Sequence, residues 1–405
     1  MFSEMENESM ERISGTVSRG LRAPIIKTGD DLRTIVTETL LKGAEAGEYE
    51  IRDRDVLAIT ESIVARSQGN YCTIDDIASD VRAKLGGEHI GIIFPIMSRN
   101  RFAICLRGFA RGAKKITLML SYPSDEVGNH LFDEDLLDDA GVNPYSDVLT
   151  REQFESIFGK SRHPFTGMDY VAYYHDLIEE EGCEAEIIFA NDPVKILDYT
   201  DCVLACDIHT RKHTKKVLLK HGAKKVCGMD DIMTASIGGS GCNPQYGLLG
   251  SNKSTETTVK LFPVNCDEFV RDVQNIILDK TGKHIEVMVY GDGAFKDPVG
   301  KIWELADPVV SPGYTDGLNG TPNELKLKYL ADNQFKDLTG EALKNAIRNS
   351  IAEKDAQLVG KMDSEGTTPR RLTDLIGSLC DLTSGSGDKG TPFVYIQGYF
   401  DNYTD

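Results

Sequence analysis

The sequence lacks the features that mark secreted and membrane proteins. No apolar run approaches the roughly 20 residues that a transmembrane helix needs. The first residues, MFSEMENESMERISG, are acidic and polar and have neither the basic nor the apolar region of a signal peptide. The nine cysteines are scattered and form no CxxC pair, which fits reduced thiols. We therefore expect a soluble, cytoplasmic protein that does not contact membranes.

Basic residues are also scarce relative to acidic ones. The chain has 45 Lys and Arg against 64 Asp and Glu, a formal net charge of −19. So much negative charge repels nucleic acids and anionic membrane surfaces, so we expect neither as a partner. A polyanionic ligand would need a local cluster of donors or a metal ion.

Length and composition are those of an ordinary globular protein. With 405 residues, of which 40% are hydrophobic and 27% charged, the chain is long enough for two or three domains. After a flexible start (residues 1–20), apolar runs alternate with amphipathic stretches, and strand, helix and strand follow one another near residues 184–228. This pattern predicts a mixed α/β fold with a mostly parallel sheet. We expect strands at 56–60, 184–190, 201–209, 285–293 and 393–396, and helices from 32, at 267–284, at 341–360 and at 369–381.

One cysteine and histidine cluster has spacing that could suit a metal. Cys202, Cys206, His209 and His213 lie in or directly after an apolar run. Metal signatures usually rest on tight pairs at defined turns, whereas this run reads as a buried strand with ordinary cysteines. Both interpretations stay open, with the strand favoured.

Three polar loops are candidates for binding chemistry. Asp292, in VYGDGAF, ends a buried strand between glycines, where α/β proteins hold metals or phosphates; a tight turn is the alternative. The loop GSNKSTE offers Ser251, Asn252, Lys253 and Glu256, a set that suits a phosphate with its cation. The loop SGSGDKG can present successive N–H groups and Lys389 to an anion. A plain connection explains each loop equally simply.

The order of these segments is more informative than each alone. APIIKTGDDL followed by IRDRDVLAITESIVARSQG, then GLLGSN, then ILDKTGK with the strand that ends at Asp292, and finally LTDLIGSLCDLTSGSGDKGTPFVYIQGY resemble successive motifs of the coenzyme F420 gamma-glutamyl ligase family. The resemblance covers a little under half of the chain. It implies a ligase-like core at 21–84 and 241–405, and an inserted α/β lobe at 85–240.

The resemblance also implies the ligands and the residues that hold them. Family members bind GTP and two divalent cations, Mg²⁺ or Mn²⁺, and form homodimers. The resemblance implies that Asp292 binds a metal ion. Leu249 and Ser386 stand where the family has a metal-binding aspartate and glutamate, so Asp388 and Glu256 are the expected substitutes. Charge neutralisation falls on Arg66, Lys253 and Lys389. The nucleotide contacts fall on Ala23, Pro24, Ile25, Ile26, Glu61, Ser62, Arg66, Ser251, Asn252, Gly385, Ser386, Gly387, Asp388, Lys389 and Gly390.

The predicted function is a GTP- or ATP-dependent ligase. It would join L-glutamate through a gamma-linked amide to a small carboxylate acceptor, deazaflavin-like or folate-like, by way of an acyl phosphate. Catalysis would rest on positioning and charge neutralisation at Asp292, Lys253 and Arg66. The alternatives are a nucleotide- or metabolite-binding protein without catalysis, and a redox or metal protein that uses Cys202, Cys206 and His209.

Overall fold

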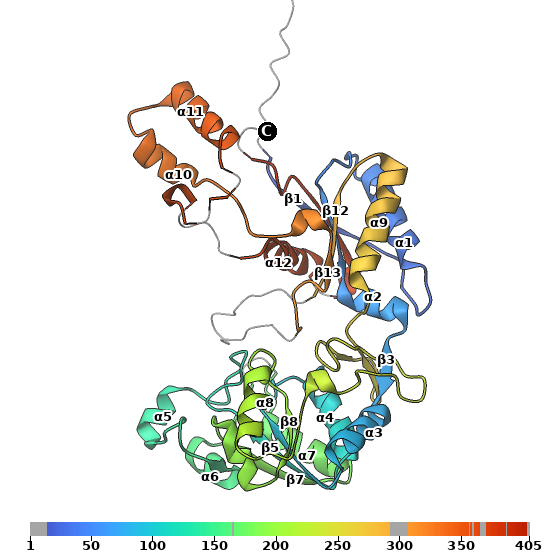
Figure 1. Cartoon of the computed structure of the whole chain (residues 1–405), viewed down its shortest axis with the longest axis vertical. Helices are drawn as coiled ribbons and strands as arrows, with labels where there is room; N and C mark the ends of the chain where they lie inside the picture. Colours follow the sequence, from blue (N-terminus) through green and yellow to red (C-terminus); the bar gives the residue numbers. More distant parts are fainter. Residues whose placement is uncertain are drawn as a thin grey trace, which may run out of the picture.

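The computed structural model has the mixed α and β fold that the sequence predicts, and its described residues form three sheets. In Figure 1 two large sheets with their helices lie at opposite ends of the molecule, and the small third sheet lies between them. The residues described are 14–163, 166–291, 307–355, 357–358, 360–364, 370–385 and 387–402.

The first sheet joins the two ends of the chain. Its central strand, β2 (Val56–Thr60), pairs in parallel with β12 (Glu286–Tyr290) and antiparallel with β14 (Phe393–Gln397). Alternate residues of β2 face opposite sides, so Leu57 and Ile59 pack under α1 and α9, while Val56 and Ala58 pack under α12. The order is β1 (Val17–Leu21), β14 (Phe393–Gln397), β2 (Val56–Thr60), β12 (Glu286–Tyr290) and β13 (Gly313–Tyr314), with helices α1 (Leu32–Ala46), α2 (Glu61–Gln68), α9 (Cys266–Thr281) and α12 (Leu372–Ser384).

The second sheet has six strands, and all its pairings are parallel except that of β6 with β7. Helices α3, α4 and α7 cover one face and α8 covers the other. The βαβ arrangement expected from the sequence is thus present. The order is β6 (Leu149–Thr150), β7 (Glu184–Phe189), β5 (Lys115–Leu120), β4 (His89–Ile93), β8 (Cys202–Ala205) and β9 (Lys225–Gly228), with α3 (Ile74–Leu85), α4 (Phe102–Arg111), α5 (Asp135–Ala140), α6 (Arg151–Phe158), α7 (Tyr170–Glu180) and α8 (Arg211–Lys220).

A small antiparallel sheet lies where the chain passes between the two larger ones. It consists of β10 (Asn252–Lys253), β11 (Thr258–Lys260) and β3 (Tyr71–Thr73). Strand β3 follows α2 of the first sheet and precedes α3 of the second, so this small sheet joins the two large sheets, each with its helices, which we call the two layers (Figure 1). Lys260 at the end of β11 is thereby brought close to α2.

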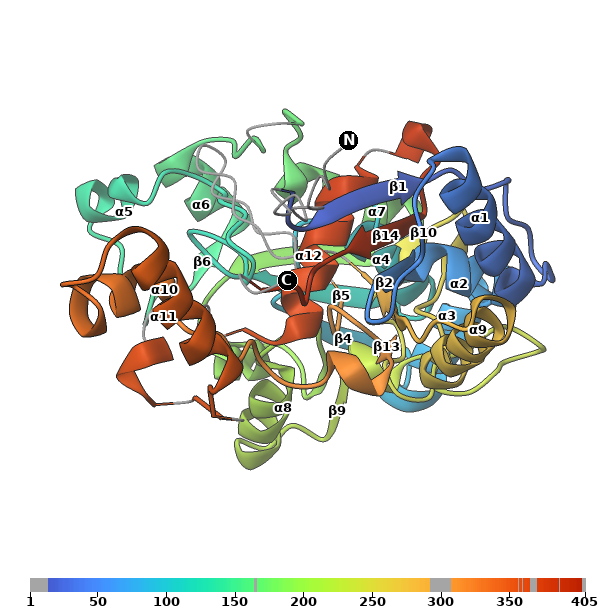
Figure 2. The same cartoon turned by 90° about the horizontal axis from the view of Figure 1, so that it is seen from above.

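The carboxyl-terminal helices differ from the expectation at one boundary. Helix α11 (Gly340–Ala352) ends before residue 360, because Ile347 and Ile351 are its last buried side chains and a charged stretch follows. Together with α10 (Leu327–Tyr329) it stands to one side of the first sheet in both Figure 1 and Figure 2. Among the helices that the structure describes, none is long and apolar enough to cross a membrane.

Candidate functional site

The first sheet carries a cavity of about 390 Å³ at one end of its central strands. Four segments that are far apart in the sequence meet there: the loop after β1, the junction of β2 and α2, the end of β12, and α12 with the loop that follows it. The lining residues are Ala23, Pro24, Ile25, Ile26, Thr60, Glu61, Ser62, Ile63, Arg66, Tyr290, Gly291, Asp381, Ser384, Gly385, Gly387, Gly390, Thr391 and Pro392.

Backbone hydrogen bonds fasten the glycine-rich loop to the other walls. The N–H of Ala23 donates to the carbonyl of Gly390 (3.1 Å), and the N–H of Thr60 donates to the carbonyl of Pro392 (3.0 Å). Gly390 has a φ of +66°, a left-handed conformation that a side chain would strain. The loop is therefore a built wall of the cavity and not a slack connection.

Helix α2 begins at the cavity. Its N-cap residue, Thr60, makes no side-chain hydrogen bond to the first turn, and Glu61, Ser62 and Ile63 of that turn line the cavity. The first N–H groups of a helix lack intrahelical partners and favour negative charge. Arg66, one turn further, is exposed and also lines the cavity, and no ion pair joins it to another described residue. This wall suits an anionic ligand.

Behind this wall lie four charged side chains, of which Glu61, Lys260 and Asp307 are buried and Arg101 is 15% exposed. Both carboxylate oxygens of Glu61 lie 2.8 Å from Nζ of Lys260. Nη1 of Arg101 lies 2.6 Å from Oδ1 of Asp307. Burial raises the pKa of the Glu61 carboxyl; Lys260 and Arg101 lower it, and Asp307 raises it further. Because Lys260, Asp307 and Arg101 all act on the charge of the Glu61 carboxyl, we treat these four residues as one unit, the charge quartet.

Tyr290 gives the cavity a buried hydroxyl group. The residue is 2% exposed, and its hydroxyl has no hydrogen-bond partner among the described residues. The nearby Ser384 hydroxyl donates to the carbonyl of Asp381 (3.0 Å). Burial raises the pKa of the Tyr290 phenol, although the neighbouring Ser384 hydroxyl lowers it, so the phenol keeps its proton and can donate. Buried polar groups without a well-formed hydrogen bond are rare, so we take this hydroxyl as a candidate ligand contact.

The cavity brings together many, but not all, of the predicted site residues. Those outside it are of two kinds. Asp292 and Ser386 fall outside the described residues. Ser251, Asn252, Lys253, Glu256, Asp388 and Lys389 are described but do not line the cavity, whereas Ala23, Pro24, Ile25, Ile26, Glu61, Ser62, Arg66, Gly385, Gly387 and Gly390 do.

The segment 251–256 has its own local contacts. Nζ of Lys253 pairs with Oε1 of Glu256 at 2.6 Å, and the Glu256 side chain is 78% exposed. Ser251 is buried, with Oγ 3.4 Å from Sγ of Cys105. In this structure Lys253 and Glu256 therefore neutralise each other at the surface, away from the cavity lining.

The described residues do not fit a two-metal centre. Leu249 is buried among apolar side chains, and the exposed Asp388 does not line the cavity. Across the described ranges there is no group of three His, Cys, Asp or Glu side chains placed to hold a metal ion. Asp292 lies beyond these ranges, so its metal-binding role stays a prediction.

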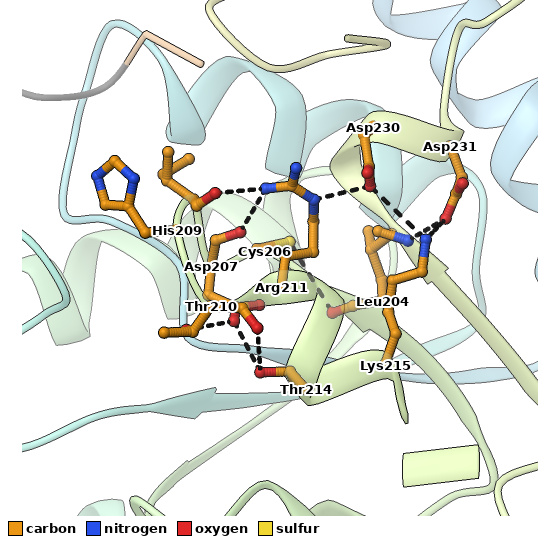
Figure 3. A network of polar contacts seen from close by, with 12 residues as sticks. Leu204, Cys206, Asp207, His209, Thr210, Arg211, Thr214, Lys215, Asp230 and Asp231 are labelled. Carbon is orange, nitrogen blue, oxygen red and sulfur yellow. Dashed lines mark hydrogen bonds and ion pairs between the residues drawn. The ribbon is translucent and has the colours of Figure 1, made fainter. Parts of the chain in front are cut away.

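The structure places the two cysteines of the cysteine and histidine cluster at the two ends of one strand. Cys202 begins β8 and Cys206 follows its end, so the strand separates the two thiols. Burial raises the pKa of Cys206 well above its usual value. Figure 3 shows that the next residue, Asp207, accepts hydrogen bonds from Thr210 and Thr214, both at 2.7 Å. This network fixes the start of α8 and supports the interpretation of 202–206 as a buried strand.

Sequence reasoning missed three members of the charge quartet and Tyr290. Lys260 lies between apolar residues in TVKLF, where a lysine inside a buried strand is itself an unusual signal. Arg101 and Asp307 give no such local signal, because 206 residues separate them in the sequence.

Comparison with known proteins agrees with the resemblance seen in the motifs. The family model described as F420-0:gamma-glutamyl ligase matches residues 20–398. No curated protein matches the chain. Because the match extends over nearly the whole chain, the second sheet lies within it as well. The chain belongs to the F420-0:gamma-glutamyl ligase family and is an amino-acid ligase.

Proposed function

We propose that the cavity binds GTP or ATP and that the protein uses it to form a gamma-glutamyl amide on a small carboxylate acceptor. The observation that carries the proposal is the convergence of the loop at 23–26, the start of α2 and the loop at 385–390 on one cavity. These are the segments in which the family resemblance places the nucleotide. The uncapped helix start and Arg66 give the cavity the electrostatic character that phosphates need.

The reaction would proceed in two steps. The acceptor carboxylate attacks the terminal phosphorus, which forms an acyl phosphate and releases the nucleoside diphosphate. The amine of L-glutamate then attacks the acyl carbon, loses a proton, and expels inorganic phosphate as the amide forms. The cavity would hold the phosphates at backbone N–H groups, with Arg66 compensating charge at the rim.

The family name indicates only the broad class of acceptor, a small carboxylate. An F420-like deazaflavin acid and a folate-like acid are the two acceptors that we propose to test. From the same resemblance we also propose that the protein forms a homodimer. Sedimentation of the purified protein would test this.

A nucleotide-binding protein without turnover is the second candidate. It is favoured by Leu249, an apolar residue at a position where the family has a metal-binding aspartate. Thermal shift with GTP or ATP, each with Mg²⁺ or Mn²⁺, tests the shared ligand; a ligand at 100 times its Kd adds about 2.7 kcal/mol of stability. Incorporation of labelled glutamate then separates the two candidates. Neither a shift nor incorporation would contradict both.

We expect Arg66→Ala to weaken nucleotide binding by about 10- to 100-fold, since a hydrogen bond to a charged group contributes about 1.5–3 kcal/mol. The loss should shrink at high ionic strength because Arg66 is exposed. Calorimetric titration measures it. Arg33→Ala is the control, since Arg33 pairs with Asp272 at 2.7 Å on α1 and α9. Equal affinity of the Arg66 variant and the wild type would place the phosphates elsewhere.

Tyr290→Phe should separate ligand binding from folding. Removing an unpaired buried hydroxyl is expected to leave the unfolding free energy of the unliganded protein unchanged or higher by about 1 kcal/mol. If the hydroxyl donates to the nucleotide, the same variant binds it about tenfold more weakly. Urea unfolding and calorimetric titration give the two numbers. A variant with lower stability and unchanged affinity would show that the hydroxyl serves the fold.

A further inference from the structure

We propose that Pro24 and Ile25 form an apolar lip at the mouth of the cavity, and that this lip binds the body of the acceptor. The inference rests on the proposed function, in which a nucleotide, an acceptor acid and L-glutamate react together. It narrows the acceptor to an acid with a flat aromatic body, and it makes Ile25 a specificity-determining residue.

Two consecutive isoleucines of the loop after β1 have opposite surroundings. Ile26 is 2% exposed and packs in the apolar core of the first sheet, whereas Ile25 is 83% exposed. The preceding residue, Pro24, is exposed as well. All three residues line the cavity. Because so little of the protein covers Pro24 and Ile25, they lie at the mouth of the cavity and not in its enclosed part.

This loop is held in place at both ends. The N–H of Ala23 donates to the carbonyl of Gly390 (3.1 Å), and the N–H of Gly29 donates to the carbonyl of Ser67 in α2 (2.8 Å). Between these bonds the buried Ile26 anchors the loop in the core. A fixed loop thus presents the Ile25 side chain to solvent. A surface that is already ordered loses little conformational entropy when a ligand covers it.

The enclosed part of the cavity can hold the nucleotide without the lip. Its volume of about 390 Å³ is that of a site for one small-molecule ligand. The start of α2 and the exposed Arg66 form its anion-binding wall. Ile26, Ile63 and Pro392 also line the cavity and give it an apolar surface for the base. Phosphates and base therefore both have a place inside, and the Ile25 side chain is left for another substrate.

Of the two remaining substrates, only the acceptor suits an apolar lip. L-glutamate carries two carboxylates and an ammonium group, which lose hydration and gain no hydrogen bond against isoleucine and proline. The acceptor must bring its own carboxylate to the terminal phosphate, so the rest of the molecule extends out through the mouth. A flat aromatic body there would cover Ile25 and remove its apolar surface from water.

Binding titrations test the acceptor and the nucleotide separately. The acceptor probes are pteroic acid and a deazaflavin carboxylic acid, each followed by the fluorescence of its ring in the presence of a non-hydrolysable analogue of GTP or ATP. We expect Ile25→Ser to weaken binding of the ring acid about tenfold, because it removes most of the apolar surface that the ring covers. Calorimetric titration of the nucleotide analogue should give an affinity within about twofold of the wild type.

Matched variants make this result specific. Ile25→Leu keeps an apolar side chain and should keep the wild-type affinity for the ring acid. Leu219→Ser removes an apolar side chain that is 56% exposed on α8 and should change neither affinity. Ile25→Ser should unfold at the same urea concentration as the wild type, because the side chain is exposed. Propionate, a carboxylate without a ring, should bind about tenfold more weakly than the ring acid, or weaker still.

Several results would overturn the proposal. One is that neither ring acid binds to the wild type, and another is that Ile25→Ser binds the ring acid as the wild type does. A loss of nucleotide affinity alone in Ile25→Ser would assign the lip to the base of the nucleotide.

Failure of the inference is distinguishable from failure of the proposed function. If neither nucleotide analogue binds to the wild type, the proposed function fails, and the ring acids are then titrated without a nucleotide to test the lip alone. If an analogue binds and Ile25→Ser changes no affinity, the nucleotide site stands and only the role of Ile25 is wrong.

Discussion

Lys260→Met is expected to lower the unfolding free energy by about 3–5 kcal/mol at neutral pH. That is the usual cost of removing one partner of a buried ion pair. The methionine fills a similar volume, so the loss comes from the carboxylate of Glu61, whose two oxygens each lose a contact of 2.8 Å. Urea unfolding followed by circular dichroism measures it.

The pH dependence of this loss has a definite sign. Burial raises the pKa of Glu61 in the folded protein, and Lys260 is the largest influence that lowers it. Without Lys260 the pKa rises further, so the folded variant holds a proton that the unfolded chain has released. A raised carboxyl pKa contributes stability below the unfolded value of about 4.3 and loses it as the pH rises. The deficit should therefore be smaller at pH 5 than at pH 7.

A double variant separates charge from packing. Lys260→Met combined with Glu61→Gln removes both charges, and replacing a whole buried pair is often neutral. We expect it to regain most of the stability that the single variant loses. If the single variant is within 1 kcal/mol of the wild type, or if the double variant is no more stable than the single one, the pair is not held in a closed, low-dielectric wall.

Local structure could be predicted where one short segment decides it. The helix expected from residue 32 begins there, and Asp31 caps it by accepting from the N–H of Thr34 (3.3 Å). Strand β2 has the bounds that its apolar run predicts. The glycine loop before β14 could be placed at a cavity only through its family resemblance, since its residues alone fit a linker equally well.

Long-range electrostatics could not be predicted in this way. The partner of Glu61 lies 199 residues away, and the partner of Asp307 lies 206 residues away. The pairing depends on how the small sheet joins the two larger ones, which no periodicity records. Lys253 and Glu256 have the chemistry and spacing predicted for a phosphate site, and here they pair with each other at the surface, so their role in binding stays a prediction.

The region between the two large sheets therefore matters both for stability and for the site. The cavity itself is built by the first sheet, whereas the cations that neutralise its buried carboxylates come from the small sheet and from the start of α4. A change that separates the large sheets would remove the contact of Glu61 with Lys260 and that of Asp307 with Arg101. The stability of the fold and the electrostatics of the site therefore depend on the same contacts.

Gly291→Ala tests the other half of the quartet and is expected to cost about 3 kcal/mol of unfolding free energy, the upper part of the range for overpacking. A Cβ atom at position 291 would overlap Oδ2 of Asp307. That carboxylate cannot move freely, because the residue is 5% exposed and its Oδ1 is held by Arg101. The strain should break the pair that joins the two layers.

Gly387→Ala is the matched control. It lines the same cavity, a Cβ there would meet nothing within 4 Å, and its φ is not positive, so we expect a change within 0.5 kcal/mol. In the Gly291 variant the displaced Asp307 should also weaken nucleotide binding, since its charge moves toward the phosphate side of the wall. Equal stability of the two alanine variants would mean that Asp307 relaxes without cost, and that its contact with Arg101 does not hold the layers together.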